Sequence, residues 1–419
     1  MNLVQTDVLI QGNTLAGWMA AYTLLFQRDC RVLMLEDTTH EASFFIDQMN
    51  VPLLPGDSVQ AYYADVRRAG AYQNDPVLVR ALCEDSTEVL AELKALGHIP
   101  LALPASGRTV ALHDEFVCNV LSQACRSHPA FRLMHGEGLR LMKKDGRIQG
   151  ALGWDAESRD FFAISAGTAL VTGRCGPTDS ASGFSMAYYA GAELTDLEFT
   201  VDQIIRPDGS VLPLSLSLGG VVTDENGRTR VPGMLAAGEL MAGVHGAGFD
   251  PGNLKTASLV FGRRAGNTLA KINLLPGADS ADLLPWAEET AAVGTEDHEN
   301  ELLSLCSEIH KAMSSVRGQY ASTALENALQ TASHAQHELN ELPPLIPEQA
   351  HDRLLTEDAM IACRLHLLAA LERRDSVGCF HRADDAGAAP SPYRIHMGLD
   401  GMILFPEKQD WRQQADKNA

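Results

Sequence analysis

A glycine-rich stretch in the middle of the chain, Gly219–Gly266, carries the residues best suited to holding a ligand for chemistry. Its pattern predicts a buried strand over Met234–Ala237 and a helix that opens near Asn253. Between them, the strand leads directly into Gly238, Glu239 and a run of small residues. Because glycine lets the backbone approach a ligand that side chains would keep away, this pattern favours a flat or phosphorylated ligand.

A second ligand-binding pattern stands near the beginning of the sequence. It predicts a strand, a glycine turn, a helix and a second strand, over Thr6–Ile10, Gly12–Gly17, Trp18–Gln27 and Val32–Leu35. This order is typical of a dinucleotide-binding fold, in which the turn holds a pyrophosphate and a carboxylate after the second strand, here Glu36, binds a ribose. Thr14 replaces the middle glycine of the usual G-x-G-x-x-G pattern. An α/β unit that binds no nucleotide therefore remains the alternative.

The composition limits the class of protein. The chain has 419 residues and a net charge of −21, with 45% hydrophobic and 21% charged residues, which fits one multi-lobed globular unit or two domains. The acidic balance argues against nucleic acid, because binding phosphates needs clustered lysine and arginine. The eight cysteines include no CxxC pair, so we expect no metal or iron–sulfur site, and reduced thiols in a cytoplasmic protein. No apolar run is long enough to cross a membrane, so we expect no direct membrane insertion.

The glycine-rich stretch also matches a known pattern. Its residues GGV, GRT, VPGM, AAGE, GVHGA, GN and VFGRRAG, in this order, closely resemble the second flavin-contacting segment of the succinate dehydrogenase/fumarate reductase flavoprotein family, which includes L-aspartate oxidase. Further similar segments are Asp57–Pro100, Ser182–Phe199 and Leu371–Asp385. The resemblance implies an α/β fold, with a Rossmann-like FAD-binding domain of the glutathione-reductase type followed by a C-terminal helical domain.

The resemblance also implies the domain boundaries. We expect the FAD-binding domain at residues 1–275, the helical domain at 276–385 and a C-terminal tail at 386–419. Family members carry a large capping domain where this chain has only residues 201–218, too few to bury a core, so the cap is predicted to be reduced to a loop. Periodicity predicts helices over Asp114–Ser127, Asp297–Leu342 and Glu357–Arg374, and a short strand at Gly401–Phe405.

By the resemblance, the cofactor is FAD, and most of its contacts can be placed. The predicted cofactor-binding residues are Gly12, Asn13, Thr14, Leu15, Ala16 and Gly17 at the pyrophosphate, Glu36 and Asp37 at the ribose, Ser43 at the flavin, Thr172 and Gly173 at the adenosine half, Gly238 and Glu239 at the ribityl chain, and Asn253 and Leu254 at the pyrimidine end. Gln48 and Met49 replace a glycine pair and would crowd or reshape the flavin pocket. His40 does not align with the flavin-linked histidine of some members, so we expect noncovalent FAD.

The residues that bind a dicarboxylate in the family are replaced. Its two histidines fall at Gln203 and Ser215, its arginine after the HGA motif falls at Phe249, and the arginine of its cap has no counterpart. Asp250 adds negative charge where a dicarboxylate would need positive charge. We therefore expect no activity on succinate, fumarate or aspartate.

His245, in the sequence VHGAG, is the one candidate catalytic residue that remains. It can exchange a proton near the flavin, or, in the interpretation we favour, it packs against the glycine-rich segment and orders it. Cys175 and Cys379 are candidate redox thiols, although single cysteines are more often small buried hydrophobic residues.

Three functions stay open at this point. The first is an FAD-dependent oxidoreductase with an uncapped site and an unknown, bulky or apolar small-molecule substrate. The second is a flavin-bearing electron-transfer subunit whose open ring face docks an iron–sulfur or other redox subunit. The third is a degenerate, non-catalytic member with weak flavin binding or none, which the replacements at Thr14, Gln48 and Met49 favour and the retained glycines oppose.

Overall fold

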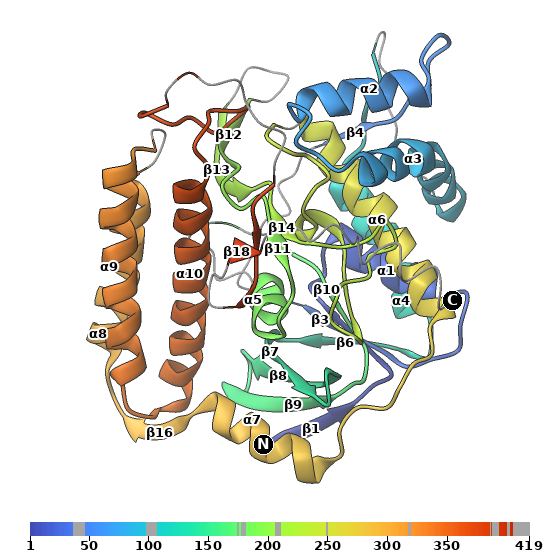
Figure 1. The fold of residues 1–419 in the computed structure, drawn as a ribbon. Coiled ribbons are helices and arrows are strands. Elements are labelled where there is room, and N and C mark those ends of the chain that lie inside the picture. Colours follow the sequence, from blue (N-terminus) through green and yellow to red (C-terminus); the bar gives the residue numbers. More distant parts are fainter. Residues whose placement is uncertain are drawn as a thin grey trace.

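The computed structural model describes residues 1–36, 47–97, 107–173, 176, 182–205, 211–248, 250–316, 320–385, 387, 394–399 and 403–404. Figure 1 shows a mixed body of sheets and helices with long helices of the C-terminal half along one side.

The dinucleotide-binding pattern near the beginning of the chain folds as predicted. Five strands form a sheet in the order β15-β10-β2-β3-β6, and every neighbouring pair is parallel. They are β2 (Val8–Gln11), β3 (Val32–Glu36), β6 (Phe131–His135), β10 (Ala169–Val171) and β15 (Met234–Ala236). Strands β2, β10 and β15 are buried throughout, as expected of a parallel sheet covered on both faces. This confirms the Rossmann-like α/β fold.

Three helices pack together next to this sheet. They are α1 (Leu15–Leu25), α4 (Asp114–Arg126) and α6 (Pro251–Lys271). Helices α1 and α6 pack very closely, and a side chain at Gly266 would have its Cβ only 2.7 Å from the carbonyl oxygen of Ala20. The close contact between these helices joins the two glycine-rich segments of the sequence.

A second sheet adjoins the first in the order β1-β9-β8-β7. Its strands are β1 (Asn2–Gln5), β7 (Glu137–Lys144), β8 (Arg147–Asp155) and β9 (Asp160–Ser165). The predicted hairpin turn at Lys144-Asp145-Gly146 is present, with positive φ angles of 52° at Asp145 and 76° at Gly146. Helix α5 (Ser182–Tyr189) packs against β7.

Helices α2 (Val59–Ala69) and α3 (Pro76–Leu96) lie next to α6, where β4 (Gln48–Asn50) pairs with β5 (Thr109–Ala111). Helix α3 starts at the predicted turn, since the Asp75 carboxylate accepts a hydrogen bond from the Val77 N–H (2.9 Å) and Pro76 fills the first helical position. Met49, which was expected to crowd or reshape the flavin pocket, is fully buried in the core shared with α1 and α6.

The segment predicted to replace the cap domain forms a two-stranded antiparallel sheet of β12 (Thr200–Ile205) and β13 (Val211–Ser217). Next to it, a four-stranded sheet runs in the order β14-β11-β17-β18. Its strands are β11 (Leu194–Thr195), β14 (Gly220–Val221), β17 (His396–Met397) and β18 (Ile403–Leu404). Strand β18 lies within the predicted strand Gly401–Phe405, whereas the pairing of β17 with β11 had no signal in the sequence.

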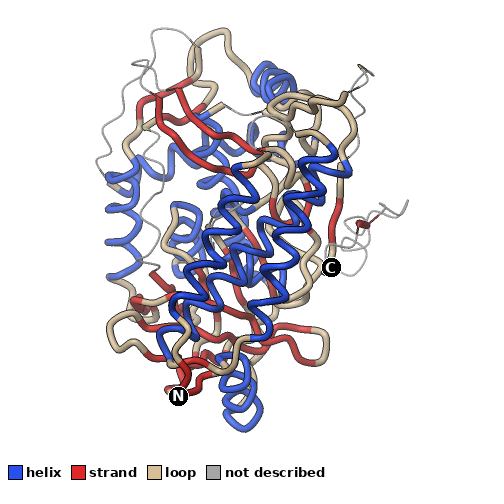
Figure 2. Tube along the Cα trace, turned by 90° about the vertical axis from the view of Figure 1, so that its left-hand side faces the viewer, coloured by secondary structure: helices blue, strands red, loops and turns tan. Residues whose placement is uncertain are grey.

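The helical part begins with α7 (Ser280–Ala291) and the short strand β16 (Val293–Glu296). It continues with α8 (Glu299–Ser314), α9 (Ser322–Glu341) and α10 (Pro347–Glu372), three helices that pack side by side (Figure 1, Figure 2). The prediction that α10 begins at Glu357 was wrong. The helix begins at Pro347 because proline suits a first helical position, and its first turns bury the polar side chains of Gln349 and His351, which hydrophobic periodicity does not count.

Candidate functional site

The turn between β2 and α1 has the shape expected of a phosphate-binding turn. Gly12 has a φ of +93°, and a Cβ there would lie 2.7 Å from Oγ1 of Thr172. A Cβ at Gly17 would collide with the carbonyl oxygen of Gly12. Thr14, in place of the middle glycine, caps α1 by accepting a hydrogen bond from the Gly17 N–H (3.1 Å). The threonine therefore fits the turn, which presents a helix N-terminus to a ligand.

The carboxylate of Glu36 lies beside this turn at the end of β3. Its Oε1 accepts a hydrogen bond from Nδ2 of Asn13 (3.2 Å), and its Oε2 lies 2.8 Å from Nδ1 of His135. Glu36 thus stands at the end of the second strand, as predicted, and its contact with a ribose stays a prediction, while the sequence did not point to His135 on the neighbouring strand β6. Asp37 and Ser43, also predicted to bind the cofactor, lie outside the described residues, as does His40.

Thr172, after the end of β10, forms hydrogen bonds to the same turn. Its hydroxyl donates to the carbonyl oxygen of Gln11 (2.6 Å) and accepts from the hydroxyl of Thr14 (3.0 Å). Gly173 follows with a φ of +122°, a conformation that favours glycine, and open space where a Cβ would stand. Thr172 therefore lies against the Gly12–Gly17 turn, and the contact of Thr172 and Gly173 with the adenosine half of FAD stays a prediction.

The segment of residues 238–248, called here the glycine loop, leaves the sheet at the same edge. It starts after β15 with a short 3₁₀ turn, Gly238–Leu240, in which Glu239 is half-buried. Gly238 has a φ of +78°, and a Cβ there would lie 2.7 Å from Cβ of Ala16 in the first turn of α1. The ends of β2, β3, β10 and β15 therefore gather the predicted pyrophosphate, ribose and ribityl contacts at one carboxyl edge, where open α/β sheets bind ligands.

The N-terminus of α6 is tied down by side-chain hydrogen bonds. Asp250 caps it by accepting from the Gly252 N–H (2.9 Å). The side-chain oxygen of Asn253 accepts from the hydroxyl of Tyr62 (2.8 Å) and from Nδ2 of Asn50 (2.9 Å). Asn253 and Leu254 are both buried, so their predicted contact with the flavin would have to come from their backbone N–H groups. Asp250 already accepts a hydrogen bond from one N–H group at this helix N-terminus, that of Gly252.

His245 is buried in the glycine loop. The turn before α3 holds one side of the loop, since the Ala247 N–H donates to Gly70 O (3.1 Å) and a Cβ at Gly70 would collide with His245 O. The other side meets the Cys379 N–H, which donates to Ala247 O (2.7 Å). Burial lowers the pKa of His245 to about 4, so its ring is neutral at pH 7 and cannot donate a proton as an imidazolium. This favours the role of ordering the loop.

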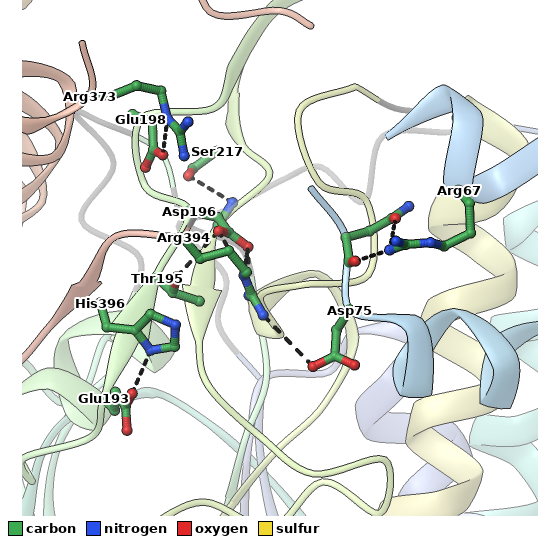
Figure 3. A network of polar contacts seen from close by, with 12 residues as sticks. Arg67, Asp75, Glu193, Thr195, Asp196, Glu198, Ser217, Arg373, Arg394 and His396 are labelled. Atoms are coloured by element: carbon green, nitrogen blue, oxygen red, sulfur yellow. Dashed lines mark hydrogen bonds and ion pairs between the residues drawn. The ribbon is translucent and has the colours of Figure 1, made fainter. Parts of the chain in front are cut away.

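Two buried ion-pair clusters lie next to the glycine loop, and reasoning from the sequence missed both of them (Figure 3). In one, Nε of Arg373 lies 2.7 Å from Oε1 of Glu198, and both side chains are fully buried. Burial, opposed by the attraction of Arg373, raises the pKa of Glu198 to about 7. The other cluster joins Arg394 to Asp196 and Asp75. Glu198 and Arg373 stand in segments that resemble the family, whereas Arg394 stands in the predicted tail, where no pattern pointed to it.

The structure describes only some of the other residues that the sequence analysis singled out. Gln203 pairs with Pro213 across β12 and β13, and Ser215 lies on β13, so both belong to the two-stranded sheet. Phe249 and Cys175 lie outside the described residues.

Within the described part of the chain, no group of three or more His, Cys, Asp or Glu side chains could hold a metal ion, and no helix is long and apolar enough to cross a membrane.

Comparisons with known proteins agree with this geometry. A family model described as an FAD binding domain matches residues 210–254. A fumarate reductase (CoM/CoB) subunit of Methanothermobacter marburgensis is 23% identical over 533 aligned residues, covering 91% of this chain and 95% of that protein. The L-aspartate oxidase of Caulobacter vibrioides is 28% identical over 65% of this chain, which spans about half (49%) of the length of that relative.

Two solved structures share the fold over nearly their whole length. Sdh1 of Mycobacterium smegmatis in complex with UQ1 matches with a TM-score of 0.82 at 17% identity, over 98% of this chain and 95% of that chain. FrdA of E. coli quinol fumarate reductase matches with a TM-score of 0.80 at 15% identity, over 96% of both chains. At this level of identity, the likeness establishes the fold.

Proposed function

Because the chain belongs to the succinate dehydrogenase/fumarate reductase flavoprotein family and is an FAD-dependent oxidoreductase, we propose that its substrate is a bulky or apolar molecule other than a dicarboxylate. When bound, FAD supplies the redox chemistry by accepting or donating a hydride. The protein's part is to hold FAD, with the Gly12–Gly17 turn at the pyrophosphate, Glu36 at the ribose and the glycine loop at the flavin. The tight turn at Gly12 and the acceptor at Glu36 support FAD binding at this edge.

The charge balance beside the glycine loop carries the argument about the substrate. A dicarboxylate needs cations that are not already neutralised. Arg394 is paired with Asp196 and Asp75, and Arg373 is paired with Glu198. Neither arginine is available unless a buried carboxylate loses its partner, which would be costly. This balance supports a substrate that is recognised by shape and apolar contact.

The experiment follows the flavin absorbance after anaerobic mixing. Oxidised protein is mixed with succinate or aspartate, dithionite-reduced protein is mixed with fumarate, and parallel samples receive a panel of bulky apolar donors. We expect no saturable change with the three dicarboxylates, and reduction by at least one apolar donor. Reduction by dithionite serves as the control that the flavin is accessible. Saturable oxidation or reduction of the flavin by any of the dicarboxylates would refute the proposal.

A second candidate function is electron transfer in a complex with an iron–sulfur or other redox protein. The name of the Methanothermobacter relative, which describes one component of a multi-subunit fumarate reductase, supports this candidate. The test is to purify the protein from its own cells and ask whether a redox-active protein co-purifies and reduces the flavin faster than any small donor. If the chain purifies alone and small donors suffice, the first candidate is favoured.

The two other expectations concern the non-catalytic alternative and the location. The tight fit of Gly12, Gly17 and Gly238 argues against a fold kept only for assembly, since a structural role alone does not require this turn geometry.

A cytoplasmic location is supported by the cysteines, because the seven that the structure describes are all free thiols. Cell fractionation would test the location.

A further inference from the structure

The predicted C-terminal tail contributes a strand and a cation to the wall of the site. Residues 394–399 run beside β11, where β17 pairs with it in antiparallel register. Arg394 lies two residues before the start of this strand, and its side chain points between Asp196 and Asp75 (Figure 3). Three segments that are distant in the sequence thus meet at one guanidinium group.

The contacts of Arg394 are those of a fixed cation whose side chain is only 16% exposed. Its Nε lies 3.0 Å from Oδ1 of Asp196 and its Nη2 lies 2.6 Å from Oδ2, which is the bidentate arrangement. Its Nη1 lies 3.8 Å from Oδ2 of Asp75. The side chain of Asp196 is fully buried and that of Asp75 is 8% exposed. Removing Arg394 would therefore leave two carboxylates in a region with little water.

The same guanidinium touches the glycine loop. Gly243 has a φ of +86°, and a Cβ there would lie 2.8 Å from Nη2 of Arg394. The carbonyl oxygen of Gly243 accepts a hydrogen bond from the Asp75 N–H (2.7 Å). Arg394 and Asp75 therefore hold the backbone of the loop at Gly243 from two directions.

The loop needs such restraints because its own sequence provides few. Gly238, Gly243 and Gly246 all have positive φ angles, and glycines lose more conformational freedom on ordering than other residues. A loop of this kind keeps one conformation only when its surroundings fix it. Two of its anchors, near Gly70 and Cys379, act at residues 245–247. Arg394 acts at the middle of the loop, between those anchors and Gly238.

We propose that Arg394 is a positioning residue that holds the glycine loop in its FAD-binding conformation, so that FAD binding depends on this cation of the C-terminal segment. The proposal rests on the assignment of FAD to this loop.

The test compares three variants with the natural protein. Arg394→Ala removes the cation, and Arg394→Lys keeps the charge but loses the bidentate geometry. His396→Ala is the matched control, because His396 lies on β17 but binds Glu193 (2.5 Å), whereas Arg394 binds Asp196 and Asp75. The measurements are the dissociation constant of FAD and the hydrogen exchange of residues 238–248 in protein freed of FAD.

We expect Arg394→Ala to weaken FAD binding and to speed exchange in the loop by about tenfold or more each. Arg394→Lys should fall between this variant and the natural protein, and His396→Ala should stay within about twofold. The proposal is overturned if Arg394→Ala leaves both quantities unchanged, or if His396→Ala changes them equally. Failure of the natural protein to bind FAD would refute the FAD assignment instead, while the exchange measurement would still test the loop contact.

A second variant covers the case in which Arg394→Ala does not fold. Gly243→Ala keeps Arg394 but places a methyl group 2.8 Å from its Nη2, at a backbone φ of +86° that favours glycine, so the guanidinium and the loop must move apart. We expect it to displace the loop and to weaken FAD binding in the same direction. Normal FAD affinity and normal loop exchange in a folded Gly243→Ala protein would overturn the proposal.

Discussion

Gly262 of α6 and Ala16 of α1 bring the two glycine-rich segments of the chain into backbone contact: a Cβ at position 262 would lie 2.5 Å from the carbonyl oxygen of Ala16. Ala16 also contacts Gly238, at the start of the glycine loop. The contact between α1 and α6 therefore sets how the pyrophosphate turn and the glycine loop face each other.

Gly262→Ala tests this contact. The added methyl group meets backbone, which cannot move aside as a flexible side chain can, so the helices must separate. We expect a loss of about 1–3 kcal/mol in the free energy of unfolding and weaker FAD binding. Denaturant unfolding and FAD titration measure the two effects. Asn267→Ala, at a half-buried position of the same helix, is the control and should change stability by about 0.5 kcal/mol or less. Equal effects of both substitutions would contradict the interpretation.

Asn253 gives a second prediction, about how α6 is anchored. Asn253→Ala removes the oxygen that accepts hydrogen bonds from Tyr62 and Asn50 and leaves these two buried donors without that partner. We expect a loss of about 1–3 kcal/mol in the free energy of unfolding. Tyr62→Phe should cost less, because it removes one donor and leaves Asn253 bonded to Asn50. If Tyr62→Phe proves the more damaging variant, the hydroxyl matters for another reason, and the anchoring role of Asn253 is wrong.

The sequence predicts those parts of the site that depend on residues close together in the chain, and misses those that depend on contacts between distant segments. The Gly12–Gly17 turn, Glu36 and the cap at Asp75 follow from patterns within a few residues, and the structure places them as expected. The Arg394–Asp196 pair joins segments that are far apart in the chain, and acidic and basic residues are too common for a pairing to be inferred. The early start of α10 was missed for a related reason, since its buried polar residues are satisfied by distant partners.

His245 provides a prediction about pH. Its pKa is lowered from 6.5 to about 4 by burial, whereas in the unfolded chain it keeps its ordinary value. Between pH 6.5 and 4 the unfolded state therefore binds more protons than the folded state, so this residue makes the protein less stable as the pH falls. The full effect is about 3 kcal/mol at most.

The measurement is the free energy of unfolding of the natural protein and of His245→Gln across this range of pH. The difference in stability between the two should shift in favour of the variant as the pH falls from 6.5 to 4, and should be constant above pH 7.5. A difference that does not change with pH would mean that the pKa of His245 is the same in the folded and the unfolded protein, which would reopen its role as a proton donor.

The last prediction concerns the contact between the second sheet and α10. Nη1 of Arg140 on β7 lies 2.7 Å from Oδ1 of Asp358 on α10, and the Asp358 side chain is fully buried. Burial raises the pKa of Asp358 to about 7, against the attraction of Arg140. Arg140→Ala leaves this carboxylate buried without its cation, so we expect a loss of about 3–5 kcal/mol in the free energy of unfolding.

The surface pair of Arg31 and Asp7 is a matched control, since it has the same 2.7 Å separation but Arg31 is 60% exposed. Arg31→Ala should cost about 1 kcal/mol or less, because water replaces the lost partner. Combining Arg140→Met with Asp358→Asn removes both charges and should recover most of the loss, because the cost comes from the unpaired carboxylate. If the double variant is as unstable as Arg140→Ala, the cost comes from packing against Tyr189, whose ring lies 4.1 Å from the guanidinium carbon, and the electrostatic explanation fails.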